Sequence, residues 1–168
     1  TMGTSFSEEQ IAMLRRLDCE IILMRDNDKA GRNAMVKEIP ELMSKKLKVS
    51  VVDLNTVKEN LQLAEDKDSK DLWDFANAGA VEQDLEKARV SGFQYLMKNQ
   101  YFLGKDFNTE TIRDAYDEAK KDELIKTSYD EMNFKDYVAK HSTYSKEEVD
   151  DIIHSLSLEE KTNPIFQF

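Results

Sequence analysis

Helical and extended patterns of apolar residues alternate in the first half of the chain. A capping box at Ser7 and Gln10 opens a segment in which apolar residues recur at helical spacing. A continuous apolar run, Ile21–Met24, comes next. A run of this kind between polar residues is typical of a central strand in a parallel sheet. The pattern therefore predicts a helix followed by a buried strand.

A second strand is predicted after an intervening helix. Residues 30–47 carry apolar side chains at helical spacing, and Pro40 within this stretch is expected to kink or divide the helix. Residues 48–54 are rich in valine, which indicates a strand. A unit of strand, helix and strand forms a right-handed crossover in a parallel sheet.

The remainder of the chain is predicted to be helical. From Gly79 onward no convincing strand pattern occurs, and helices are expected over residues 81–98, 109–125, 130–141 and 146–156. The expected architecture is an α/β part with a partial parallel sheet over residues 1–79, followed by an all-helical part over residues 80–168.

Two carboxylates directly follow the first predicted strand. Asp26 and Asp28 are two residues apart, so on an extended chain their side chains point to the same side. Ligands of open α/β sheets collect beyond the carboxyl ends of such strands, and carboxylate oxygens bind hard cations such as Mg²⁺. The alternative is structural, because an aspartate at a strand end also starts a turn and caps the next helix.

Several short segments follow one another in the order of a known family. They are Gly3-Thr4, Glu9-Gln10, Asp26-Asn27-Asp28-Lys29-Ala30-Gly31 and Lys70-Asp71. Together they resemble the Toprim core of bacterial DnaG-type DNA primases, in which the third segment reads Asp-Gly-Asp-x-Ala-Gly and the fourth reads Lys-Asp-Pro-Asp-Glu. The resemblance is specific over residues 2–79. The helical remainder is similar to the helical subdomain that follows Toprim in these primases.

The resemblance implies roles for particular residues. Asp26 and Asp28 correspond to catalytic, metal-binding acids that hold Mg²⁺ or Mn²⁺. Asp71 matches the third acidic element and Asp74 matches it less closely, because this chain reads Lys70-Asp71-Leu72-Trp73-Asp74 there. A ligand in the acidic loop, at Asp66 or Asp68, stays open as an alternative. Lys29 and Arg32, near the start of the next helix, are candidates for contacts with a nucleoside triphosphate.

The resemblance also implies what lies outside this chain. Toprim domains carry a glutamate on a strand upstream of the Gly-Thr turn, and the family's zinc-binding and helicase-binding modules lie elsewhere. We therefore expect a primase fragment that is inactive alone and holds no zinc. The intact protein is expected to act in the primosome as a DNA-directed RNA polymerase, using a single-stranded DNA template and nucleoside triphosphates and contacting the replicative helicase.

Charge argues against a general nucleic-acid surface on this chain. The formal net charge is −10, with 12 basic and 15 acidic residues up to Gly79 and 12 basic and 19 acidic residues beyond it. Because phosphate binding relies on basic patches, the helical half is interpreted as structural or facing a partner.

The remaining composition predicts a cytoplasmic protein without a membrane segment. The single cysteine, Cys19, allows no internal disulfide, and no apolar run is long enough to span a bilayer. His141 and His154 lie near predicted helix ends without a second ligand at zinc spacing, so both are expected to be exposed helix termini.

Two further functions compete with the primase interpretation. Another Toprim enzyme, a topoisomerase or a nuclease, would use the same metal chemistry, although no tyrosine here has the setting of a topoisomerase nucleophile. A noncatalytic module that docks a replisome protein through the acidic helical half belongs to a different class.

Overall fold

A computed structural model describes residues 6–62, 72–77 and 79–155. The chain divides into two compact units, Thr1–Gln100 and Tyr101–Phe168. The division falls after Gln100 rather than after Gly79. The assignment of the two parts to a Toprim domain and a primase helical subdomain, with boundaries at 1–79 and 80–168, stays a prediction.

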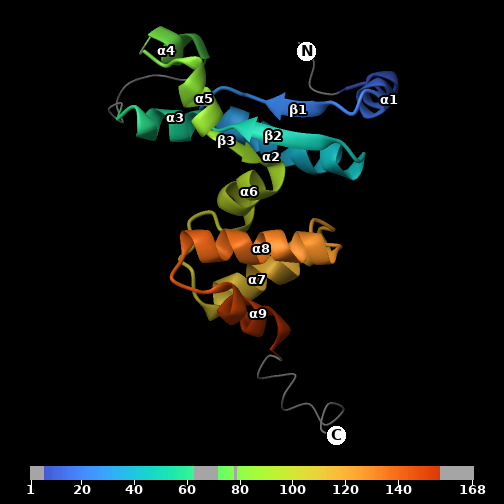
Figure 1. Ribbon diagram of the computed structural model, residues 1–168, viewed down its shortest axis with the longest axis vertical. Helices are drawn as coiled ribbons and strands as arrows, with labels where there is room; N and C mark the ends of the chain where they lie inside the picture. The colour runs from blue at the N-terminus through green and yellow to red at the C-terminus, as the bar shows by residue number, and fades with distance from the viewer. Residues whose placement is uncertain (1–5, 63–71, 78, 156–168) are drawn as a thin grey trace, which may run out of the picture. The chain divides into compact units, whose positions relative to one another are not determined.

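The first unit is built on a three-stranded mixed sheet in the order β1-β2-β3. Strands β1 (Glu20–Leu23) and β2 (Lys48–Val52) are parallel, as Figure 1 shows, and β3 (Arg89–Ser91) pairs with β2 in the antiparallel direction. The helices around the sheet are α1 (Glu8–Arg16), α2 (Lys29–Ser44), α3 (Leu54–Asn60), α4 (Leu72–Asn77), α5 (Glu82–Lys87) and α6 (Gly92–Leu96). The predicted parallel pair and its linking helix are confirmed.

Local signals explain where the early elements begin. Ser7 accepts a hydrogen bond from the Gln10 amide, and the Gln10 side chain accepts one from the Ser7 amide, so the predicted capping box starts α1. Helix α2 continues through Pro40 and is not divided there. Pro40 is exposed, whereas Ile39 and Leu42 on either side of it are buried. Proline has no backbone N–H to donate to the helix, and the packing of these neighbours keeps the helix continuous there.

One face of the sheet carries the main core of this unit. The register pairs Ile21 with Val49 and Leu23 with Val51, and all four side chains are buried. Helices α2 and α6 contact β2. On the other face Ile22 is 48% exposed. Among the described strands β1 lies at the edge of the sheet and its side chains alternate between exposed and buried, so the prediction of a central strand is wrong within the described residues.

The predicted helix over residues 81–98 is wrong. The chain there forms α5, the short strand β3, α6 and a π-helix, η1 (Met97–Tyr101). Leu85 of α5 packs partly buried against a core, and Phe93 and Leu96 of α6 are buried, so apolar residues recur at near-helical spacing on both sides of β3. Ser91 caps α6 in a capping box with Gln94, and this local signal marks the interruption. The expectation of no strand beyond Gly79 is corrected by β3.

The second unit is helical, as expected. Its helices are α7 (Thr109–Lys121), α8 (Ser128–His141) and α9 (Lys146–His154). Helix α9 contacts both α7 and α8. Phe102 and Tyr116 each contact Phe134, with ring centroids 6.0 and 5.5 Å apart, and all three side chains are buried. Across the described residues, no helix combines the length and apolar content that crossing a membrane requires.

Candidate metal and nucleotide site

The turn after β1 is closed by its own hydrogen bonds. The Asp28 amide donates to the Asp26 carbonyl oxygen at 2.8 Å. Asp28 has an extended backbone and is the N-cap of α2, where its Oδ1 accepts a hydrogen bond from the Gly31 amide at 2.6 Å. Asp28 therefore caps a helix, as the structural alternative predicted. Its metal role stays a prediction.

Gly31 lets α2 begin directly against this turn. A Cβ atom built on Gly31 would lie 2.1 Å from the Asp26 carbonyl oxygen and 3.1 Å from Asp28 Oδ1. No side chain fits between the helix and the Asp26 backbone. The glycine in the Asp-x-Asp-x-x-Gly segment is thus required by close backbone packing, and it fixes where the two aspartates lie.

Asp26 and Asp28 line the same open pocket, with a volume of ≈ 370 Å³. Asp26 is exposed and Asp28 is half-buried. Mg²⁺ in enzymes is commonly held by one or two carboxylates together with substrate phosphates and waters. Two carboxylates on one open pocket fit that ligand set.

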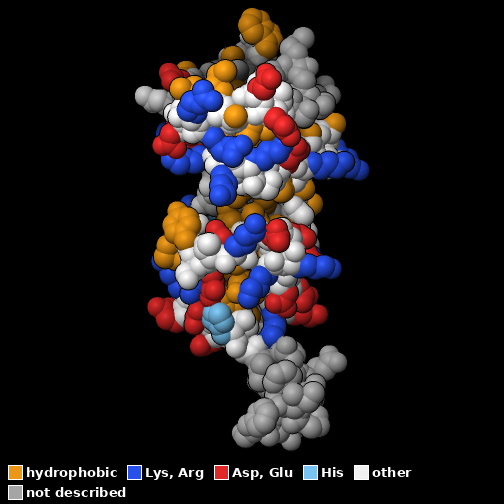
Figure 2. All heavy atoms as spheres, turned by 90° about the vertical axis from the view of Figure 1, so that its right-hand side faces the viewer, with side chains coloured by type: hydrophobic (Ala, Val, Ile, Leu, Met, Phe, Trp, Pro, Cys, Tyr) orange, Lys and Arg blue, Asp and Glu red, His pale blue; other side chains and the backbone are white. Residues whose placement is uncertain are grey.

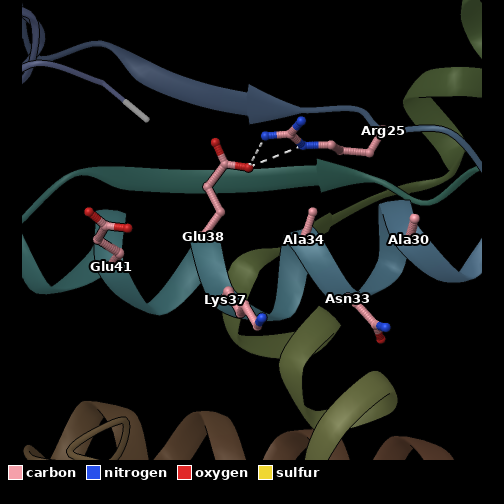
Figure 3. Close-up of a pocket in the computed structure, with 7 residues that line it drawn as sticks. All are labelled: Arg25, Ala30, Asn33, Ala34, Lys37, Glu38 and Glu41. Atoms are coloured by element: carbon pink, nitrogen blue, oxygen red, sulfur yellow. Dashed lines mark hydrogen bonds and ion pairs between the residues drawn. The ribbon is translucent and has the colours of Figure 1, made fainter. Parts of the chain in front are cut away.

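A second pocket of ≈ 360 Å³ continues along α2 and shares three lining residues with the first, namely Arg25, Ala30 and Ala34. Figure 3 shows the Arg25 side chain, beyond the end of β1, pointing toward Glu38, whose side chain extends from α2. Both Nε and Nη2 of Arg25 donate to Glu38 Oε2. This pair fixes the Arg25 guanidinium beside the pocket that holds the aspartates.

Of the third acidic element, the described residues include Asp74 alone. Asp71, like Asp66 and Asp68, lies outside the described residues. Asp74 lies in α4, is half-buried and is not among the residues that line the pocket of Asp26 and Asp28. Of the three predicted metal ligands that the structure describes, Asp26 and Asp28 line one pocket, and the metal roles of Asp71 and Asp74 stay predictions.

Lys29 and Arg32 occupy the first turn of α2, beside the capped end of the helix. Both are exposed, and Arg32 Nη1 donates to Asn27 Oδ1 at 3.3 Å. The helix N-terminus carries partial positive charge that favours anions. Their predicted contact with a triphosphate agrees with this position and stays a prediction.

Asp53 is a buried acid that the sequence analysis missed. It follows β2 as Asp26 follows β1, and it caps α3 by accepting a hydrogen bond from the Asn55 amide at 3.0 Å. Lys98 Nζ lies 3.1 Å from its Oδ2. Burial, together with the negative charge of Asp53, raises the pKa of Tyr95 to about 12. The available signal was its place at the end of the second strand.

Charges of both signs mix on the visible surface. Figure 2 shows Lys and Arg side chains interspersed with Asp and Glu over the face that is drawn. Acidic side chains lie next to the basic ones on that face.

Comparison with known proteins connects the turn and its pocket to a family. Residues 1–70 match the family model described as Toprim-like. The chain is 32% identical over 110 residues to a DNA primase of Borreliella burgdorferi, a match that covers 62% of this chain and 19% of the primase. The chain therefore spans about a fifth of that relative's length. No solved structure matches it. These matches confirm the resemblance of the N-terminal part to the Toprim domain and support a role in the primase or Toprim group.

Proposed function

We propose that this chain is part of the catalytic core of a DNA primase, which makes RNA primers for DNA replication by metal-assisted nucleotidyl transfer. The observation that carries the proposal is the shared pocket of Asp26 and Asp28 beyond the carboxyl end of β1, within the stretch that matches Toprim. The intact protein would use a single-stranded DNA template and nucleoside triphosphates. A replicative helicase stays a predicted partner.

In this proposal the residues around the turn have two roles, binding the cation and binding the triphosphate. Asp26 and Asp28 would hold Mg²⁺ or Mn²⁺, with Asp71 and Asp74 as further predicted ligands. A bound divalent cation supplies charge neutralisation for phosphoryl transfer. Lys29 and Arg32 hold the triphosphate beside the positive end of α2.

Gly31 and the Arg25–Glu38 pair keep this turn in place. Gly31 allows α2 to pack on the Asp26 carbonyl, which fixes the backbone between the two carboxylates. Glu38 holds the Arg25 guanidinium beside the pocket, so the cationic group next to the acids has a defined position.

An Asp28→Asn variant of the intact parent protein separates catalysis from capping. Asparagine caps helices about as well as aspartate, because its Oδ1 accepts the same hydrogen bond. The variant therefore keeps α2 while removing the negative charge. We expect primer synthesis to fall on the order of 10²-fold or more, as when one electrostatic group of an active site is removed.

Asp26→Asn should have the same effect. Asp114→Asn is the matched control, because Asp114 is an exposed acid on α7, outside the pocket. Unchanged primer synthesis by Asp28→Asn and Asp26→Asn would show that these acids serve the fold alone, and the catalytic assignment would be wrong.

A further inference from the structure

One cluster in the helical unit joins a histidine to two carboxylates from different helices. Glu131 lies on α8, and Asp150 and His154 lie four residues apart on α9. One ligand atom from each residue lies within 4.8 Å of the other two, and within the described part of the chain this is the group of three with that property. None of these residues belongs to the proposed nucleotidyl-transfer site.

The atoms of this cluster converge on the His154 ring. Its Nε2 lies 2.5 Å from Glu131 Oε1 and 3.5 Å from Asp150 Oδ1. Glu131 and Asp150 are half-buried, and the His154 side chain is 53% exposed. One imidazole nitrogen and two carboxylate oxygens therefore point to the same place, which stays open to solvent on the histidine side.

Neighbouring side chains orient both carboxylates. Lys135 Nζ lies 3.0 Å from Asp150 Oδ1, the same oxygen that lies 3.5 Å from His154 Nε2. The Tyr116 hydroxyl lies 3.5 Å from Glu131 Oε2, the oxygen that does not face His154. Metal ligands in proteins are commonly fixed by such outer partners.

We propose that Glu131, Asp150 and His154 form a binding site for a first-row transition cation of the Zn²⁺ class, which links α8 to α9. Imidazole and carboxylate ligands suit Zn²⁺, and a site with three protein ligands leaves a fourth position for water. The His154 ring must retreat by about 1 Å, because ligand bonds of about 2.0–2.1 Å place neighbouring ligand atoms about 3.3 Å apart. Its exposure allows that movement.

This site cannot be recognised from the spacing of its residues along the sequence. Glu131 is 23 residues from His154, and the two meet because α8 packs against α9. The expectation that the chain holds no zinc rested on the family's zinc-binding module lying elsewhere, and His154 was set aside because no second ligand lies at zinc spacing along the sequence. The proposal replaces that expectation for the helical unit and is independent of the primase proposal.

Isothermal titration of Zn²⁺ into the untagged full chain tests the site. A Cys19→Ser background removes the single thiol, which is exposed and lies in the other unit. We expect one equivalent to bind with a dissociation constant on the order of micromolar. His154→Gln and Glu131→Gln should each weaken binding by more than about tenfold, since loss of outer partners alone costs 10–100-fold in other sites.

His141→Gln is the matched control, because His141 is the other histidine of the chain and lies at the end of α8. It should bind Zn²⁺ as the parent does. The His154 ring resonances should shift on adding Zn²⁺, while those of His141 stay in place. The proposal is overturned if the parent shows no saturable binding below about 1 mM, or if either His154→Gln or Glu131→Gln binds as tightly as the parent. Equal weakening by His141→Gln would overturn it as well.

Discussion

Replacing Gly31 by alanine tests why a glycine closes the acidic turn. The added methyl group would lie 2.1 Å from the Asp26 carbonyl oxygen, about 1 Å or more short of ordinary contact. The obstacle is backbone rather than a flexible side chain. Either the Asp26 turn or the start of α2 must therefore move, and the hydrogen bond from the Gly31 amide to Asp28 Oδ1 moves with it.

The competing energies have opposite signs. Alanine in place of glycine favours a helix by up to about 1 kcal/mol. Overpacking against a fixed neighbour costs about 1–3 kcal/mol, and weakening of an N-cap costs about 0.5–2 kcal/mol. Gly31→Ala should therefore destabilise the first unit by about 0.5–4 kcal/mol, although the substitution raises intrinsic helix propensity.

Urea unfolding followed by two-dimensional amide NMR measures the two units separately. The Val51 amide of β2 reports on the first unit and the Val138 amide of α8 on the second. Asn33→Ala is the matched control, because Asn33 is an exposed residue of the same helix whose replacement gains propensity without a collision. If Gly31→Ala leaves the first unit as stable as Asn33→Ala does, close packing does not explain the glycine.

Two other predictions concern buried polar groups. Asp53→Ala should destabilise the first unit by about 1–3 kcal/mol, because it leaves the Asn55 amide and the Lys98 ammonium without this acceptor. Asp53→Asn should lower the free energy of unfolding less, and an equal decrease for both variants in urea unfolding would contradict the capping argument. Burial raises the pKa of Tyr137 to about 12 from its ordinary value of 10.0, so the stability that this phenol contributes is complete below pH 10 and is lost as the pH rises from 10 to 12. That loss is about 2–3 kcal/mol. In Tyr137→Phe the free energy of unfolding of the second unit should therefore fall less between pH 9 and pH 11.5 than it does in the parent. An unchanged pH dependence would refute this.

Short-range signals made the early elements predictable. The capping box at Ser7 and the apolar run from Ile21 are local, and packing did not override them. Strand β3 has three residues, too few for alternation to be visible. Its existence depends on pairing with β2, which no local pattern encodes. Pro40 was misjudged for a related reason, because buried neighbours decide whether the helix continues.

The site was predictable to the extent that it depends on neighbours in sequence. Asp26 and Asp28 share a turn, so their common pocket follows from their spacing. Asp53 joins Lys98 across 45 residues and Glu131 joins His154 across 23, and both pairs depend on how helices pack. Such pairs become visible only once the fold is known.

Binding of Mn²⁺ at the acidic turn is the most direct test of the central claim that Asp26 and Asp28 form a cation site. Paramagnetic broadening of amide signals is measured in the chain and in Asp28→Asn, which keeps the cap of α2. We predict that the amides from Asp26 to Gly31 broaden with an affinity of about millimolar, as expected for two carboxylates, and that Asp28→Asn loses this effect. Broadening there no greater than around the exposed Asp114, or broadening that survives in Asp28→Asn, would contradict the claim.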